Sequence, residues 1–169
     1  MPEEIINRVA NSKLKTFDLE EIYPDGKRVV FDIKDWLFEE IILKEKDFRE
    51  FVNNHDWSQY KKSFVAIVCS SDAIIPSWAF MLVASKITPF ANKVVIGDLE
   101  LLETAIYQEL ISFLDLKSFT DSYVIIKGCS EKPVPASAFA FLIEKLQPIV
   151  KSIMFGEACS SVPLFKAKK

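Results

Sequence analysis

Cysteine, glycine, histidine and arginine are all scarce in this chain of 169 residues, which contains three, four, one and three of them. Three cysteines are too few for a disulfide scaffold, and an odd number without a signal peptide predicts reduced thiols in the cytoplasm. The low glycine content excludes collagen-like and glycine-rich disordered chains. All three arginines lie within the first 49 residues, so the rest of the chain has no guanidinium group to bind a phosphate at two points.

Long hydrophobic runs are also absent. The longest, residues 73–84, is interrupted by Pro76 and Ser77 and is too short to span a bilayer. The net charge of −3 disfavours a protein that binds nucleic acid through bulk electrostatics. We therefore expect a cytoplasmic protein that binds neither nucleic acid nor membrane. Its partners cannot be identified from the sequence, and a homo-oligomer stays open.

Half of the residues are hydrophobic and 12% are aromatic, which is enough for a packed core without metals or disulfides. No internal repeat, low-complexity tract or linker interrupts the chain. We predict a single α/β domain over residues 1–169. It comprises a mixed α+β N-terminal part, residues 1–60, and a regular βαβ part, residues 61–165.

The N-terminal part contains a turn sequence at residues 23–26, Tyr-Pro-Asp-Gly, between two runs with strand character. The runs cover residues 15–22 and 27–33, and the turn residues are typical of a β-hairpin. Farther on, Phe48, Phe51 and Val52 follow at i, i+3 and i+4. This spacing predicts an amphipathic helix that ends near residues 53–55.

The remainder of the chain alternates between short and long apolar segments. Four short runs predict strands at residues 64–69, 93–97, 123–128 and 152–156. Three longer segments predict helices at residues 75–87, 99–113 and 135–146. Such alternation favours a three-layer sandwich, a mostly parallel mixed sheet with helices on both faces and the N-terminal hairpin added to it.

The three cysteines share a position in this pattern. Cys69, Cys129 and Cys159 each lie near the end of a predicted strand, and each is followed by a serine. Ligands bind at the carboxyl ends of the strands in open parallel sheets. We therefore predict that the three thiolates form a metal site, with zinc favoured over an iron–sulfur cluster. Three protein ligands leave a fourth position open, as in zinc-dependent hydrolases and transferases.

Several other side chains are candidates for the same site. Asp72 is a further candidate ligand, and Asp98, Glu157 or His55 could also fill the fourth position. Glu157 and Asp98 are the candidate catalytic acid–base residues. Each has an ordinary structural interpretation, because Asp72 and Asp98 precede helical segments, Glu157 lies in a loop and His55 lies at a helix end. Whether the protein is an enzyme stays open.

Two alternatives to a zinc protein stay open. One is an iron–sulfur or redox protein, and the other is a non-catalytic interaction module whose cysteines only pack the edge of the sheet. The sequence has no glycine-rich phosphate loop, and a Ser–His–Asp triad would have to use His55, which precedes the first predicted parallel strand.

Five segments taken together resemble the bacterial family of unknown function number 2480, along essentially the whole chain. They are Glu4–Ser12, Phe31–Leu37, Leu43–Arg49, Ile126–Ser130 and Gly156–Ser160. This resemblance implies no activity. Residues 128–133 are also similar to the Gly-Cys-Pro-Pro-Arg-Pro loop of the cluster-bearing small subunits of hydrogenases and respiratory quinone reductases, whose paired cysteines are missing here.

Overall fold

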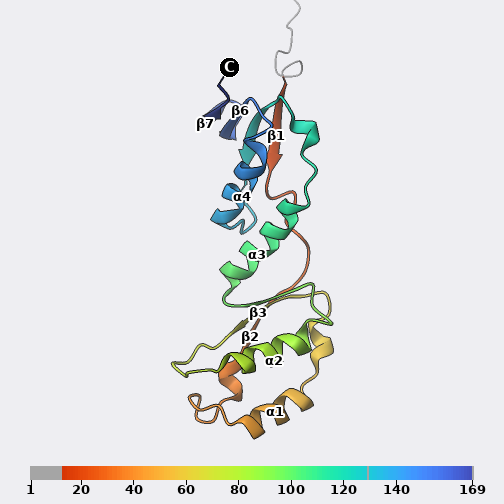
Figure 1. The fold of residues 1–169 in the computed structure, drawn as a ribbon, viewed down its shortest axis with the longest axis vertical. Coiled ribbons are helices and arrows are strands. Elements are labelled where there is room, and N and C mark those ends of the chain that lie inside the picture. Colours follow the sequence, from red (N-terminus) through yellow and green to blue (C-terminus); the bar gives the residue numbers. More distant parts are fainter. Residues whose placement is uncertain (1–12, 129, 169) are drawn as a thin grey trace, which may run out of the picture. The chain divides into compact units, whose positions relative to one another are not determined.

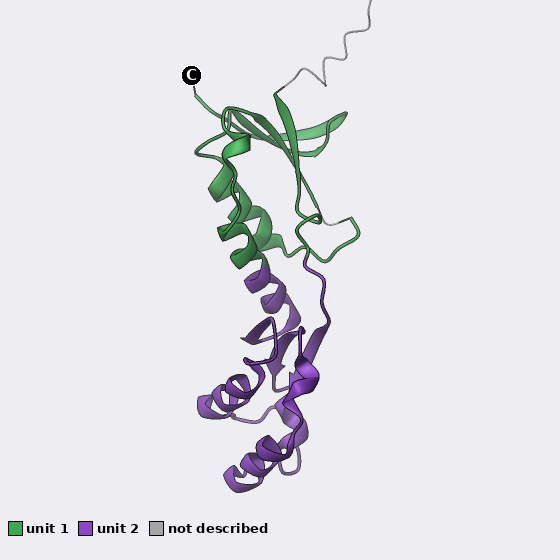
Figure 2. Ribbon diagram, turned by 90° about the vertical axis from the view of Figure 1, so that its right-hand side faces the viewer, with its two compact units in different colours: residues 1–23, 107–169 green, residues 24–106 purple. Residues whose placement is uncertain are grey.

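The structure is a computed structural model, and it describes residues 13–128 and 130–168. The chain divides into two compact units, coloured separately in Figure 2. Unit 1 comprises the described residues up to Tyr23 and those from Tyr107 onward, and unit 2 comprises Pro24–Ile106. Each unit has its own sheet and its own buried core. Both sheets are mostly parallel, which confirms the α/β class.

Unit 2, whose strands β2 and β3 are labelled in Figure 1, contains a three-stranded parallel sheet in the order β2-β3-β4. The strands are β2 (Arg28–Asp32), β3 (Phe64–Val68) and β4 (Lys93–Ile96). The 3-10 helix η1, the helix α1 and the 3-10 helix η2 connect β2 to β3, at Ile33–Trp36, Glu45–Asn54 and Trp57–Tyr60. Helix α2 (Ser77–Ile87) connects β3 to β4.

The core of unit 2 forms where the helices cover the sheet. Ile67 on β3, Phe48 on α1 and Val83 on α2 are completely buried in one cluster. The predicted amphipathic helix is confirmed as α1, but only Phe48 and Val52 of its expected apolar face are buried. Phe51 is 46% exposed, so it belongs to another face of the helix.

Unit 1 contains a four-stranded sheet in the order β1-β5-β6-β7. The strands are β1 (Leu14–Asp18), β5 (Tyr123–Lys127), β6 (Ser152–Glu157) and β7 (Ser160–Lys166), of which only β7 is antiparallel to its neighbour. Helix α3 (Leu99–Ser112) begins in unit 2 and ends in unit 1. The 3-10 helix η3 (Lys117–Phe119) and helix α4 (Ala136–Leu146) complete unit 1.

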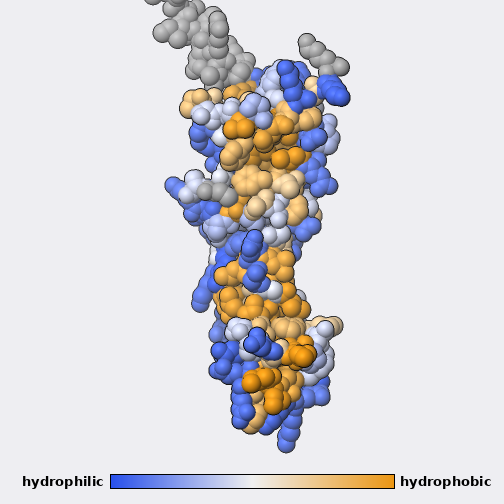
Figure 3. Space-filling model, turned by 90° about the vertical axis from the view of Figure 1, so that its left-hand side faces the viewer, coloured by the Kyte–Doolittle hydropathy of each residue, from blue (hydrophilic) through white to orange (hydrophobic). Residues whose placement is uncertain are grey.

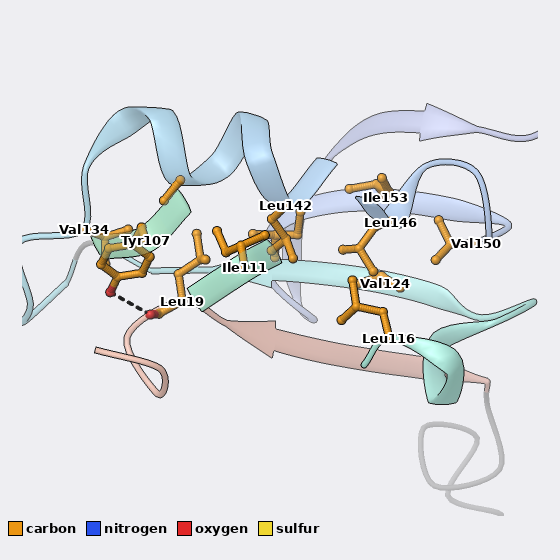
Figure 4. Packing of buried hydrophobic residues seen from close by; sticks show 12 residues of the cluster. Leu19, Tyr107, Ile111, Leu116, Val124, Val134, Leu142, Leu146, Val150 and Ile153 are labelled. Carbon is orange, nitrogen blue, oxygen red and sulfur yellow. Dashed lines mark hydrogen bonds between the residues drawn. The ribbon is translucent and has the colours of Figure 1, made fainter. Parts of the chain in front are cut away.

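Helices α3 and α4 supply much of the unit 1 core (Figure 4). Leu142 on α4 and Ile111 on α3 are buried beside Val124 of β5. The Tyr107 hydroxyl, also buried, donates a hydrogen bond of 2.9 Å to the Leu19 carbonyl, as Figure 4 shows. The Lys145 ammonium donates to three carbonyls at the end of α3, at distances between 2.8 and 3.0 Å. Two of them, those of Ile111 and Ser112, belong to the last turn of α3, where carbonyl groups lack N–H partners within the helix.

The strands and helices predicted from residue 63 onward are confirmed, with boundaries within two residues of those expected. The prediction of an N-terminal hairpin is wrong. β1 pairs in parallel with β5, and β2 pairs in parallel with β3, so the two strands beside the Tyr-Pro-Asp-Gly turn lie in different sheets. Each strand finds an apolar parallel partner distant in sequence, and the turn marks the passage from unit 1 to unit 2.

The expected single central sheet is likewise replaced by two separate sheets. Apolar runs reveal that strands exist, but they do not reveal which strands pair. The structure also adds β7, which the sequence did not predict. Gly156 permits the tight β6–β7 connection, because its φ is +118° and a Cβ there would lie only 2.8 Å from the Ser160 carbonyl oxygen.

Candidate functional site

The carboxyl edge of the unit 2 sheet brings together residues that follow β2 and β3. The Asp32 carboxylate accepts hydrogen bonds from the backbone N–H groups of Lys34 and Ser70, at 3.0 and 3.1 Å. Burial acts to raise the pKa of Asp32, but hydrogen bonds from Ser70 and Lys34 outweigh it and lower the pKa. Beside it, the partly buried Cys69 sulfur lies 3.3 Å from the Ser71 hydroxyl. This edge is thus tied together by internal hydrogen bonds.

Two further predicted site residues of unit 2 lie near helix starts. The Asp98 carboxylate accepts a hydrogen bond of 2.8 Å from the Leu101 N–H group, so it caps the N-terminus of α3. Asp72 is exposed in the loop before α2. The structural interpretation of Asp98 is therefore supported by its contacts, whereas Asp72 lines a surface cavity described below.

The carboxyl edge of the unit 1 sheet carries an ion pair. Lys127 at the end of β5 lies opposite Asp18 of β1 in the strand register. Its ammonium group lies 2.6 Å from the Glu157 carboxylate at the end of β6. The hydrogen bond to Glu157, assisted by the charges of Glu157, Asp18 and Glu20, raises the pKa of Lys127. Glu157 therefore forms an ion pair at this edge, and its acid–base role stays a prediction.

The loop after β5 is held by another carboxylate. Glu20 accepts hydrogen bonds from the backbone N–H group of Ser130, from the Ser130 hydroxyl at 2.9 Å and from the Glu131 N–H group at 3.0 Å. The hydrogen bond from Glu131 and those from Ser130 lower the pKa of Glu20. The donors of this loop are consequently used by the protein itself.

The predicted cysteine site is not assembled by the described residues. Cys69 follows β3 in unit 2, and Cys159 is exposed in the turn between β6 and β7 in unit 1. Cys129 lies outside the described residues. Among the residues described, no three His, Cys, Asp or Glu side chains gather as a metal ion requires. Zinc or cluster binding by these cysteines stays a prediction.

A different feature of unit 2 has the form of a binding site. A surface cavity of about 480 Å³ lies between helix α1 on one side and η1 and the residues after it on the other. We call this cavity the acidic pocket. Its volume falls within the range of about 300–1,000 Å³ that is typical of ligand sites. The pocket is lined by Asp35, Trp36, Leu37, Phe38, Glu39, Lys44, Asp47, Glu50, Phe51 and Asn54.

One face of α1 forms a wall of the acidic pocket. Asp47, Glu50, Phe51 and Asn54 stand at i, i+3, i+4 and i+7, a spacing that places side chains along one side of a helix. Phe48 and Val52, on the buried side, anchor the same helix in the core. The α1 helix therefore presents a rigid row of two carboxylates, an aromatic ring and an amide to the pocket.

Aromatic rings form the other distinctive part of the pocket. The Phe51 ring stacks on the Trp36 indole, with ring centroids 5.8 Å apart and an interplanar angle of 22°. Edge contacts from Phe31 and Phe48 hold Trp36 from the core side. These contacts fix the indole in place, so the aromatic wall is preorganised.

The charges of the pocket are unbalanced. Asp35, Glu39, Asp47 and Glu50 supply four carboxylates, and none of them takes part in an ion pair among residues 13–128 and 130–168. The single cation in the lining is Lys44, whose ammonium nitrogen lies 3.2 Å from the centroid of the Phe38 ring. One cation is thus already held on an aromatic ring of this pocket.

His55 lies behind this wall, at the end of α1. Its Nε2 atom lies 2.9 Å from the Tyr60 hydroxyl and 3.1 Å from the Gln59 side-chain nitrogen. Because an amide nitrogen only donates, Nε2 serves as an acceptor and the ring is neutral. Burial lowers the pKa of His55, although Asp56 opposes the shift. His55 therefore supports the aromatic wall, where its ring lies against the Trp36 indole with centroids 5.2 Å apart.

The acidic pocket was not predicted from the sequence. The signal for half of it was present, since the residues at positions 47, 50, 51 and 54 have helical spacing. Phe51 was assigned to the apolar face with Phe48, which concealed the pattern. The approach of Asp35 and Trp36 to this helix depends on tertiary packing, so no local pattern could have indicated it.

The described residues include no helix that is both long enough and apolar enough to cross a membrane. Comparison with curated proteins and with solved structures finds no match. Residues 3–167 match the family described as "Protein of unknown function (DUF2480)". The match covers nearly the whole chain and agrees with the resemblance carried by the five sequence segments, and the chain therefore belongs to the DUF2480 family.

Proposed function

We propose that the protein is a non-catalytic binding module and that its acidic pocket receives an organic cation, an alkylammonium or guanidinium group. The observation that carries this proposal is the combination of four carboxylates with the stacked pair of Trp36 and Phe51 in one cavity. An ammonium or guanidinium group is attracted both by carboxylates and by the faces of aromatic rings.

The chemistry of the wall favours an organic cation over a metal ion. Metal ions such as Mg²⁺ and Ca²⁺ need several oxygen ligands at short range, and the rings of Trp36 and Phe51 supply none. An organic cation can place its charge near Asp47 or Glu50 and its carbon atoms against the rings. The pocket is open to water, so modest affinity and strong salt dependence are expected.

Choline and its neutral isostere dimethylbutanol, in which carbon replaces the nitrogen, form a matched pair of probes. Heteronuclear NMR of the full chain would follow the Trp36 indole N–H group and the backbone amides of residues 35–54 during titration. We expect saturable shifts with choline and binding of the isostere weaker by about tenfold. Equal affinity for the two probes, or no choline-dependent shift in this segment, would contradict the proposal.

The double variant Asp47→Asn, Glu50→Gln tests the contribution of the carboxylates. Both side chains are exposed, so the fold should tolerate the change. Choline affinity should fall by about fivefold, because two favourable charges are lost. Glu100→Gln, an exposed acidic residue in the first turn of α3 that does not line the pocket, is the control and should leave binding unchanged.

Metal binding by Cys69, Cys129 and Cys159 remains a separate prediction, whether zinc or an iron–sulfur cluster is the group held. It is tested by metal analysis of protein purified anaerobically without added metal. About one equivalent of zinc in colourless protein, lost when the cysteines are replaced by serine, would support it. Broad visible absorption would indicate the cluster, and metal below about 0.1 equivalent would overturn both.

A further inference from the structure

Next to the acidic pocket, a short hairpin presents apolar side chains to solvent. Phe38 and Ile42 are joined by two backbone hydrogen bonds, of 2.8 and 3.0 Å. Between them, Glu39 and Glu40 have φ values of +51° and +61°, a left-handed conformation that costs free energy for residues other than glycine. This strained turn holds Ile41 and Ile42 outward, 61% and 52% exposed.

A second surface cavity of about 600 Å³ lies on the other side of the hairpin. Ile41 and Ile42 line it, together with Trp78 and with Ile74, which is 96% exposed. The residues that precede Ile41 in the hairpin, Phe38 and Glu39, line the acidic pocket. The hairpin therefore joins the two cavities into one surface with an apolar centre, which we call the hairpin surface.

The rim of the hairpin surface is acidic. Glu45 and Asp72 line the second cavity, in addition to the four carboxylates of the acidic pocket. Two of the cations nearby are already engaged: Lys44 lies over the Phe38 ring, and Arg49 pairs with Glu45 at 2.9 Å. An occupant that complements this surface must supply both apolar side chains and positive charge.

From this complementarity we infer that the hairpin surface binds a segment of another protein that is rich in apolar residues and in lysine or arginine. The inference rests on the proposed function, because the acidic pocket would receive one of the basic side chains of that segment. Anionic lipid headgroups would be repelled by the acidic rim. A second copy of this chain, packed by two-fold symmetry, would place the same carboxylates against each other.

The test uses a labelled amphipathic peptide of about 14 residues, with leucine at i, i+3, i+4 and i+7 and lysine at most other positions. A second peptide replaces each leucine by serine, and a third replaces each lysine by glutamate. Fluorescence anisotropy with the full chain should show binding of the first peptide, with the other two weaker by about tenfold or more. Equal binding of the serine peptide would overturn the inference, since charge alone would then suffice.

The double variant Ile41→Ser, Ile74→Ser separates this inference from the proposed function. Both side chains are mostly exposed, so unfolding midpoints should stay near that of the parent. Peptide affinity should fall by about tenfold, whereas choline affinity should not change. Met81→Ser is the matched control, because Met81 is 63% exposed on α2 and lines neither cavity.

The outcomes distinguish the two proposals. Unchanged peptide binding in the Ile41→Ser, Ile74→Ser variant, with choline binding intact, overturns the hairpin surface alone. Failure of the parent protein to bind choline overturns the proposed function. Binding to phosphatidylglycerol vesicles, or self-association that the double variant abolishes, would overturn the choice of a basic polypeptide as the occupant.

Discussion

The carboxyl edge of the unit 1 sheet and the acidic pocket of unit 2 use charged residues in opposite ways. In unit 1, Lys127 is paired with Glu157, and the Glu20 carboxylate is bound by the loop at residues 130–131. In unit 2, four carboxylates and a single cation, Lys44, line the acidic pocket beside partly exposed aromatic rings. On the face drawn in Figure 3, hydrophobic residues gather in several surface patches. The charges at the unit 1 sheet edge have partners within the protein, whereas the excess of carboxylates in the acidic pocket is the basis of the proposed binding function.

Removing core volume from unit 1 should have the largest effect and should show how separate the units are. Leu142→Ala deletes a fully buried side chain, which should lower the free energy of unfolding by about 2–5 kcal/mol. All three tryptophans, Trp36, Trp57 and Trp78, lie in unit 2. The urea transition followed by circular dichroism should therefore shift more than that followed by tryptophan fluorescence. Identical shifts would show that the units unfold as one.

Removing the backbone strain from the Phe38–Ile42 hairpin of unit 2 should change the free energy of unfolding by less, and should raise it. Glu40→Gly places a residue without Cβ at φ +61° and should raise the free energy of unfolding by about 0.5–1 kcal/mol. Glu45→Gly, within the first turn of α1, is the control and should be destabilising, since glycine is unfavourable in a helix. Glu40→Gln removes the charge that pairs with Lys34 at 3.5 Å and keeps the Cβ, so lower stability of Glu40→Gly than of Glu40→Gln would mean that the turn is not strained.

Acid should weaken unit 2 through His55, the single histidine of the chain. Its pKa in the folded protein is below the ordinary value of 6.5, so the unfolded chain binds a proton that the folded chain resists. Stability should therefore fall as the pH drops from about 7.5 through 6.5. Tryptophan-detected urea unfolding should reveal this slope, and His55→Gln should flatten it. A slope unchanged by the substitution would assign the effect to other groups.

The smallest effect is expected at the edge of the unit 1 sheet. Glu157→Gln removes the carboxylate that pairs with Lys127, but both groups are partly exposed and such pairs contribute little. The unfolding midpoint should barely move, and the NMR shifts of the acidic pocket should not change. A large change at residues 35–54 would show that the difference between the units is not local.

The sequence predicted the helices and strands better than it predicted which strands pair. The apolar runs of β3, β4, β5 and β6 identified those strands, since buried parallel strands are continuously apolar. Pairing was missed because the turn signal at residues 23–26 was local, whereas β1 and β2 each pair with a strand far along the chain. Strand β7 was not predicted because Pro163 and exposed side chains interrupt its apolar pattern.

The predicted and observed sites differ for a similar reason. Asp98 precedes a helix as the sequence suggested, whereas Glu157 ends β6 and does not lie in a loop. The contacts of these two residues, a helix cap and an ion pair, depend on their neighbours, and their acid–base roles stay predictions. The prediction that the cysteines converge assumed a single sheet. In the structure, Cys69 follows a strand of one sheet and Cys159 follows a strand of the other. The acidic pocket depends on the approach of η1 to α1, which is a property of the packed unit.

The most direct test of the cation-binding account is the ratio of the dissociation constants of dimethylbutanol and choline, measured by NMR at residues 35–54. In the parent protein, choline should bind about tenfold more tightly than the neutral isostere. In the Asp47→Asn, Glu50→Gln variant, the ratio should fall toward one while the fold is retained. A ratio near one in the parent, or a ratio unchanged by the double substitution, would contradict the assignment of the acidic pocket to an organic cation.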